Sequence, residues 1–179
     1  LFIAEKRGER RDEIIKKYGV KELDQQLLLD AILIAVKPQD FLTTIKELPS
    51  SATDSALIVS FAAGIRIKAI EDNLSKGSRV IRVMPNTPMV MGAGMSALSL
   101  GSNATSIDQE WVKGFLAKAG EVIVVDEKLQ DAVTATSGSG PAYFFAFTEA
   151  IIKAAERLGI SRQDATILAS QTLIGAALM

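Results

Sequence analysis

The chain of 179 residues contains no cysteine and no histidine. The absence of cysteine excludes disulfide bonds and thiol nucleophiles. The absence of histidine removes the side chain that most often serves as a general base and as a metal ligand. Chemistry at this chain must therefore proceed without a thiol or an imidazole, and we predict no metal site.

The chain also lacks a charge excess and a long hydrophobic run. It carries 20 lysine and arginine residues against 21 aspartate and glutamate residues, a net charge of -1 with no basic patch, which argues against nucleic acid as a partner. No apolar run reaches the ~20 residues that span a bilayer, and residues 1–4 are too short for a signal-peptide core. We expect a soluble cytoplasmic protein that binds neither nucleic acid nor membrane.

The Gly-x-Gly-x-x-Gly fingerprint of dinucleotide-binding folds is missing as well. Its nearest counterpart, Gly92-Ala93-Gly94, precedes a strand instead of opening a helix after one, so we reject it. The chain starts on an apolar strand and stops at Met179 within an apolar helix, without a capping residue. We therefore expect a part of a longer protein.

What is present is a regular alternation of strands and helices up to about residue 127. The apolar run 31–36 predicts a strand buried on both faces, as found in parallel sheets. Strands are predicted over 1–4, 20–23, 31–36, 56–61, 79–84, 95–98 and 121–126, helices over 9–18, 24–29, 41–48, 65–74 and 106–119, and a loop over 49–54. This order predicts an α/β fold with a doubly wound parallel sheet, residues 1–127 forming a dinucleotide-binding domain.

Only helices are predicted from residue 128 onward, and they form a second domain over 128–179. Pro141 suits a first helical turn, and Ser139 is a candidate N-cap. The free N–H groups of such a turn suit a carboxylate or phosphate. Helices over 141–158 and 162–179, the latter capped by Ser161 and Asp164, expose more apolar surface than a small sheet can cover, which predicts a homodimer or higher homo-oligomer through this domain.

Four strand ends would meet at one edge of the predicted sheet, where parallel α/β folds bind their ligands. They are Glu5-Lys6-Arg7, the segment 35–39, Ala62-Ala63-Gly64 and the segment 84–88. Lys6 and Arg7 stand where a 2′-phosphate is recognised and favour NADP, whereas Glu5 would favour the free ribose of NAD.

Six motifs occur in one order across nearly the whole chain: Ala35-Val36-Lys37-Pro38-Gln39, Ala62-Ala63-Gly64, Val83-Met84-Pro85-Asn86-Thr87-Pro88, Asp131-Ala132-Val133-Thr134, Ser137-Gly138-Ser139-Gly140-Pro141-Ala142-Tyr143 and Gln171-Thr172-Leu173-Ile174-Gly175-Ala176-Ala177. In residues, order and spacing they closely resemble the pyrroline-5-carboxylate reductase family. The resemblance implies a Rossmann domain without its first strand, followed by a truncated helical dimerisation domain. It also implies reduction of 1-pyrroline-5-carboxylate to L-proline, the last step of proline biosynthesis, with NADP or alternatively NAD as cofactor.

The resemblance also implies roles for individual residues. Cofactor-binding residues would be Lys6, Arg7, Ala35, Val36, Lys37, Pro38, Phe61, Ala62, Ala63 and Asn86, the last near the nicotinamide. Substrate-binding residues would be Glu127, Thr134, Gly138, Ser139 and Gly140. Thr134 is the candidate catalytic residue, through a hydrogen bond near the ring nitrogen. No strong general acid is expected, because a protonated cyclic imine is already electrophilic.

The chain departs from the family by lacking the first strand with its glycine-rich pyrophosphate loop and the later loop that holds the substrate carboxylate. We expect a chain limited to these residues to be inactive. Two other readings stay open. One is a different Rossmann dehydrogenase of the β-hydroxyacid or prephenate type, which would need a lysine or histidine acid/base, and Lys128 and Lys153 are the only lysines on the helical side. The other is a non-catalytic scaffold that retains the fold.

Overall fold

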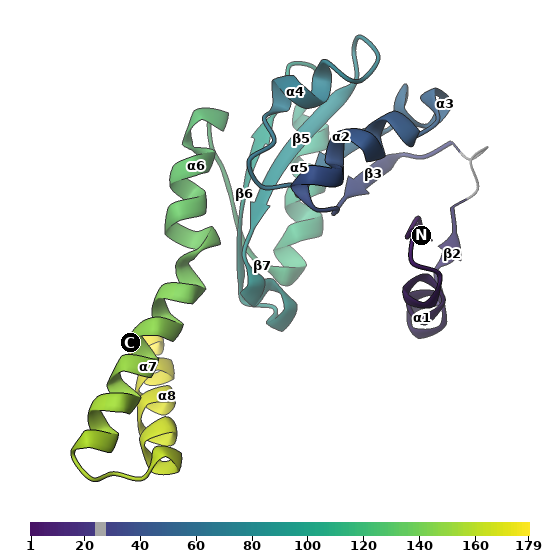
Figure 1. Ribbon diagram of the computed structural model, residues 1–179. Helices are drawn as coiled ribbons and strands as arrows, with labels where there is room; N and C mark the ends of the chain where they lie inside the picture. Colours follow the sequence, from purple (N-terminus) through teal and green to yellow (C-terminus); the bar gives the residue numbers. More distant parts are fainter. Residues whose placement is uncertain (24–27) are drawn as a thin grey trace. The chain divides into compact units, whose positions relative to one another are not determined.

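The computed structural model describes residues 1–23 and 28–179 (Figure 1). Its internal contacts group the chain into two units. Unit 1 consists of Leu1–Val83 and Ser99–Trp111, and unit 2 consists of Met84–Leu98 and Val112–Met179. Strands β5 (Arg79–Pro85) and β6 (Gly94–Leu100) each contribute residues to both units.

Unit 1 contains three parallel strands in the order β3 (Ala31–Ile34), β4 (Leu57–Ser60) and β5. The helices between them are α2 (Pro38–Glu47), α3 (Ser50–Thr53) and α4 (Ile67–Glu71). A second, two-stranded parallel sheet pairs β1 (Phe2–Ile3) with β2 (Lys21–Glu22), and α1 (Gly8–Tyr18) connects these two strands. The parallel α/β arrangement predicted from the alternation is confirmed.

The core of unit 1 forms where apolar residues of the strands meet those of α2 and α4. Its fully buried members are Ile34, Phe41, Ile45, Ile58, Ala62, Ile67, Ile70 and Val80. These side chains come from positions that the sequence spaces at helical or strand periods, so that burial of one face of each element builds the core.

Three predictions for unit 1 are wrong, and one lies outside the described residues. Glu5-Lys6-Arg7, predicted to end a strand of the same sheet as the segments 35–39 and 62–64, follows β1, which belongs to the separate two-stranded sheet. The strand β3 is not buried on both faces, because it ends the order β3-β4-β5 and Leu33 remains 38% exposed. The segment 49–54, predicted as a loop, contains the short helix α3. The helix predicted over 24–29 falls largely on residues 24–27, which are outside the described residues.

Unit 2 contains the parallel pair β6 and β7 (Gly120–Val124), followed only by helical elements, as predicted. The helix α5 (Ser106–Leu116) and the 3₁₀ turn η2 (Ala117–Ala119) precede β7, and η1 (Thr87–Met91) precedes β6. After β7 come η3 (Glu127–Leu129), α6 (Gln130–Val133), the π-helical turn η4 (Thr134–Gly138), α7 (Gly140–Arg157) and α8 (Arg162–Leu178).

The helices α7 and α8 lie side by side as a hairpin (Figure 1). Ala165 and Ala169 of α8 are buried with Ile152 of α7, and the small alanine side chains let the two helix backbones approach closely. The predicted cap by Ser161 and Asp164 is confirmed, because Ser161 Oγ accepts a hydrogen bond from the Asp164 N–H at 3.1 Å. The Ser161 hydroxyl in turn donates to the Asp164 carboxylate at 2.7 Å.

Gly120 is required where β7 begins opposite β6. It pairs with Gly94 in the parallel register and has a φ of 141°, a conformation that L side chains rarely adopt. A Cβ atom at position 120 would overlap the backbone of Gly94. By contrast, Gly114 on α5 is exposed, and a Cβ atom there would meet no other heavy atom within 4 Å.

Replacing these two glycines by alanine should therefore change stability in opposite directions. Gly120→Ala should lower the free energy of unfolding by about 3 kcal/mol through backbone strain and overlap. Gly114→Ala should raise it by roughly 0.5–1 kcal/mol, because alanine favours the helix and restricts the unfolded chain. Urea denaturation measures both values. An unchanged urea midpoint for Gly120→Ala would contradict the overlap.

Candidate functional site

The carboxyl ends of β3 and β4 lie next to each other in unit 1. Ile34 is the register partner of Ser60, and the N–H of Phe61 donates to the Ile34 carbonyl at 3.0 Å. The segments 35–38 and 61–63, both predicted to bind a cofactor, therefore leave adjacent strands at one edge. Ala62 is buried, and Ala35 and Ala63 are exposed. Such small side chains leave room for a flat ligand to approach the backbone.

The helix α2 begins at this edge, immediately after β3. Pro38 occupies its first turn, and Lys37 precedes it in an extended conformation with no side-chain capping bond. The N–H groups of a first helical turn and an exposed lysine beside them both attract anions. This donor set fits the phosphates of a dinucleotide.

Lys6 and Arg7 lie just before α1, and each is paired with a carboxylate. Lys6 Nζ is 3.0 Å from Glu47, the last residue of α2, and Arg7 Nη2 is 3.1 Å from Glu5. Exposed ion pairs of this kind contribute little to stability. Both cations can therefore exchange their carboxylate partners for a phosphate group.

Glu5 is held in its ionised form by Arg7. The Arg7 side chain donates through Nε at 3.2 Å and Nη2 at 3.1 Å, and its backbone N–H donates at 3.0 Å. These bonds lower the pKa of the Glu5 carboxyl from 4.5 to about 2. Glu5, the residue expected to favour NAD, is thus hydrogen-bonded to the neighbouring Arg7.

Asn86 lies in unit 2, directly after β5. Its Nδ2 donates to the Ser137 carbonyl at 3.1 Å, and its Oδ1 accepts from the Met95 N–H at 2.8 Å. Nearby, a Cβ atom at Gly138 would lie 2.6 Å from Met84 Cε, so only glycine accommodates the methionine without a shift. Sequence reasoning missed the contact of Met84 with Gly138, since nothing in the local pattern marks a residue 54 positions away.

The predicted substrate residues Thr134, Gly138, Ser139 and Gly140 share a single turn, η4, and the start of α7. Thr134 Oγ1 donates to the Gln130 carbonyl at 2.8 Å, and Ser137 Oγ donates to the Val133 carbonyl at 3.1 Å. The hydrogen of the Thr134 hydroxyl is thereby directed at the helix backbone, while its lone pairs remain able to accept. Glu127, the fifth predicted residue, is half-buried in η3, with a bonding partner of its own.

Ser139 is the N-cap residue of α7 and Pro141 lies in its first turn, as predicted, but the open helix start expected there is wrong in two respects. Ser139 has helical dihedral angles and makes no side-chain capping bond. Its N–H donates to the Thr134 carbonyl at 2.8 Å, and the Ala142 N–H donates to the Ser139 carbonyl at 3.0 Å. The chain enters α7 through the π-helical turn instead of through a loop, and these two N–H groups are already used.

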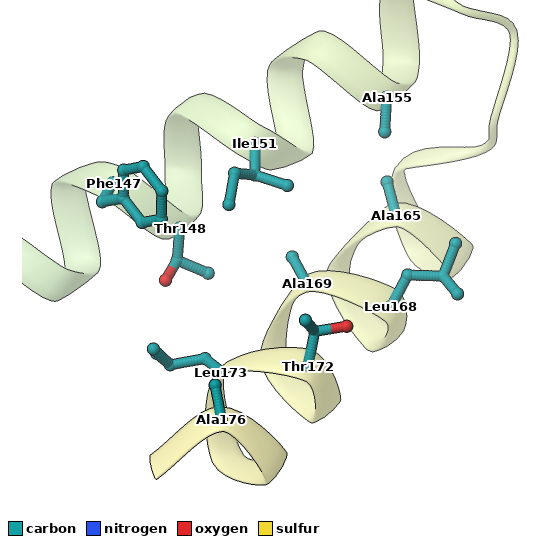
Figure 2. A pocket seen from close by; sticks show the side chains of 10 residues that line it. All are labelled: Phe147, Thr148, Ile151, Ala155, Ala165, Leu168, Ala169, Thr172, Leu173 and Ala176. Carbon is teal, nitrogen blue, oxygen red and sulfur yellow. The ribbon is translucent and has the colours of Figure 1, made fainter. Parts of the chain in front are cut away.

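An apolar groove of about 230 Å³ runs between α7 and α8 (Figure 2). Its wall on α7 contains Phe147, Thr148, Ile151 and Ala155, and its wall on α8 contains Ala165, Leu168, Ala169, Thr172, Leu173 and Ala176. The chain as a single copy also exposes Tyr143, Phe144 and Phe145 on α7, each by more than half. An apolar area of this kind is typical of a surface that another protein covers.

Among residues 1–23 and 28–179, no group of three or more acidic side chains could hold a metal ion. No helix within the same residues is long and apolar enough to cross a membrane.

Several known proteins that are similar to this chain are named pyrroline-5-carboxylate reductase. The family model for pyrroline-5-carboxylate reductase dimerisation matches residues 127–179. A pyrroline-5-carboxylate reductase from Corynebacterium melassecola is 38% identical over 186 residues, which cover 100% of this chain and 69% of the relative.

Solved structures agree with the sequence matches. A pyrroline-5-carboxylate reductase from Coxiella burnetii superposes with a TM-score of 0.91 at 33% identity, covering 99% of this chain and 68% of its own. A pyrroline carboxylate reductase from Plasmodium falciparum, solved with NADP bound, has a TM-score of 0.83 at 27% identity, covering 99% and 66%. The chain thus spans about two thirds of the length of these relatives.

The pairing of Glu5 with Arg7 predicts how Glu5 titrates. Since folding lowers the pKa of Glu5 from 4.5 to about 2, the contribution of the pair is complete above pH 4.5 and is lost as the pH falls toward 2. Arg7→Ala should raise this pKa partway to 4.5, because the backbone N–H of residue 7 still donates. Arg10→Ala, which removes only a distant charge, should change it far less. Carbon-13 NMR of the Glu5 carboxyl measures both, and equal shifts in the two variants would refute the pairing.

Proposed function

The chain belongs to the pyrroline-5-carboxylate reductase family, and we propose that the protein containing it reduces 1-pyrroline-5-carboxylate to L-proline, with NADPH as hydride donor and NADH as the alternative. The observation that carries the proposal is the similarity over the full chain, 38% identity with a named reductase. The NADP-bound relative supports the choice of cofactor.

The carboxyl edge of unit 1 supports the cofactor assignment. The exposed Lys37 at the start of α2 would hold a phosphate, and the small residues Ala35, Ala62 and Ala63 would leave room for the rings. The paired cations Lys6 and Arg7, which follow β1, remain the proposed partners of the 2′-phosphate. When bound, the reduced nicotinamide supplies the hydride. Because both cations become free only by leaving a carboxylate, we expect the 2′-phosphate of NADP to compete with Glu5 for Arg7.

The turn η4 and the start of α7 would hold the substrate. The imine can be protonated by water near neutral pH, so the chain's task is to orient its carbon and to hold its carboxylate. Thr134 would accept a hydrogen bond near the ring nitrogen, because its own hydrogen is donated to Gln130. This arrangement needs no side chain that is a strong acid.

The division into a dinucleotide domain over 1–127 and a helical domain over 128–179 remains part of the proposal, and the match of the dimerisation model to residues 127–179 supports it. We further propose a homodimer or higher homo-oligomer formed through α7 and α8. The apolar groove and the exposed aromatic residues of α7 support this surface. A cytoplasmic location completes the proposal.

The two alternative functions have less support. A dehydrogenase of the prephenate type would need a lysine acid/base, yet Lys128 is paired with Asp126 at 2.9 Å and Lys153 with Glu149 at 3.4 Å, both on exposed surface. A non-catalytic scaffold would not require the cofactor and substrate motifs to be retained together.

The activity is tested by following nicotinamide absorbance with the intact protein, 1-pyrroline-5-carboxylate and either NADPH or NADH. We expect oxidation of the cofactor that depends on the imine and yields proline, which chromatography identifies. Prephenate serves as the control substrate with the oxidised cofactors. Absence of oxidation with both reduced cofactors would overturn the reductase, and turnover of prephenate would favour the alternative.

The role of Thr134 is tested with a matched pair of variants. Thr134→Val removes the hydroxyl at nearly constant shape and should lower kcat/KM by about tenfold, the loss of one hydrogen bond to a charged group. Thr136→Val removes the equivalent bond to the Ala132 carbonyl from an exposed residue of the same turn and should leave kcat/KM within twofold. Equal values for both variants and the parent protein would remove Thr134 from the mechanism.

A further inference from the structure

Pro141 leaves a gap in the hydrogen bonding of the helix that it begins. In a continuous α-helix the carbonyl of residue 137 accepts from the N–H of residue 141, but proline has no N–H. The next donor, the Ala142 N–H, is directed at the Ser139 carbonyl at 3.0 Å. The Ser137 carbonyl therefore has no α-helical partner one turn ahead.

The ring of Pro141 is also compatible with the shape of the turn before it. A proline ring collides with the carbonyl four residues earlier, here that of Ser137. The chain from Thr134 to Gly138 forms a π-helical turn, which is wider than an α-helical turn and relieves this collision. The widened turn directs the Ser137 carbonyl toward a partner outside the helix.

That partner is Asn86, 51 residues earlier in the chain. Its Nδ2 donates to the Ser137 carbonyl at 3.1 Å while its Oδ1 accepts from the Met95 N–H at 2.8 Å. The two bonds fix the orientation of the amide, because the reversed amide would set oxygen against carbonyl and N–H against N–H. A half-buried side chain that satisfies two backbone groups holds three segments together.

A second contact joins the same segments independently of Asn86. Met84 lies two residues before Asn86, and its Cε is 2.6 Å from the position that a Cβ atom of residue 138 would take. The end of β5 therefore meets the π-helical turn twice, through an apolar contact at Gly138 and a hydrogen bond at Ser137.

We propose that Asn86 is a positioning residue that supplies the hydrogen bond removed by Pro141 and thereby sets the substrate turn, 134–140, against the loop that follows β5. The proposal rests on the proposed function for the identity of the substrate, 1-pyrroline-5-carboxylate. It replaces a direct role of the Asn86 amide in nicotinamide binding with an indirect role, exerted through Ser137.

A double-mutant cycle tests this compensation. Asn86→Ala should lower kcat/KM for the imine by about tenfold through kcat, while the KM for the nicotinamide cofactor stays within twofold. Pro141→Ala restores an N–H in reach of the Ser137 carbonyl, so Asn86→Ala in that background should cost only about twofold. An equal factor in the two backgrounds would overturn the proposal.

The matched control is Asn73→Ala. The Asn73 side chain is also half-buried and donates to a helix carbonyl, that of Ala69 at 2.9 Å, but it lies in unit 1 outside the predicted site. It should leave kcat/KM unchanged and show no coupling to Pro141→Ala.

A further variant and a second measurement keep the outcome clear. Asn86→Asp preserves shape and the acceptor for Met95 but turns an oxygen toward the Ser137 carbonyl, so it should impair kcat at least as much as Asn86→Ala. Hydrogen exchange of the Met95 N–H should accelerate in Asn86→Ala and not in Asn86→Asp.

The urea midpoints of the four proteins of the cycle report the same coupling without any turnover. An inactive parent protein would therefore refute the reductase and leave this test intact. Additive urea midpoints would refute the bridge.

Discussion

The parallel pairing of β3, β4 and β5 is the constraint on which the cofactor edge depends. The register sets Ile34 beside Ser60 and Ser60 beside Arg82. Because the strands run in one direction, the residues that follow β3 and β4 emerge at one edge, and α2 begins there after the exposed Lys37. The parallel pairing of β3 with β4 thus places three alanines, at positions 35, 62 and 63, at the same edge as Lys37 and the start of α2.

The proposed substrate turn depends on one proline in a comparable way. Pro141 has no N–H to donate to the Ser137 carbonyl, and the turn before it, from Thr134 to Gly138, is π-helical. A side chain from a distant segment, Asn86, then satisfies the exposed carbonyl. The missing N–H of Pro141 is in this way linked to a contact between the segment that contains Asn86 and the turn that contains Ser137.

The charged side chains of the proposed 2′-phosphate site, between β1 and α1, are paired in a way that allows exchange of partners. Lys6 and Arg7 are cations with exposed carboxylate partners, and the ionised Glu5 is stabilised by Arg7. A dinucleotide phosphate would replace these carboxylates as the partner of the cations without burial of an unpaired charge. The proposed site for the 2′-phosphate of NADP therefore also contains Glu5, whose negative charge would repel that phosphate.

Apolar periodicity and motif spacing were sufficient to predict the parallel α/β order, the helical end and the family, because both are properties of the amino-acid order and need no knowledge of contacts. The sequence also predicted the cap at Ser161 correctly, since that bond spans three residues. It failed at Leu33, at α3 and at Ser139, where neighbours in space or the helix before Pro141 decide the conformation. Only the tertiary structure paired Glu5 with Arg7 and Asn86 with Ser137, because side-chain rotamers and contacts across 51 residues are set by packing and leave no periodic trace in the chain.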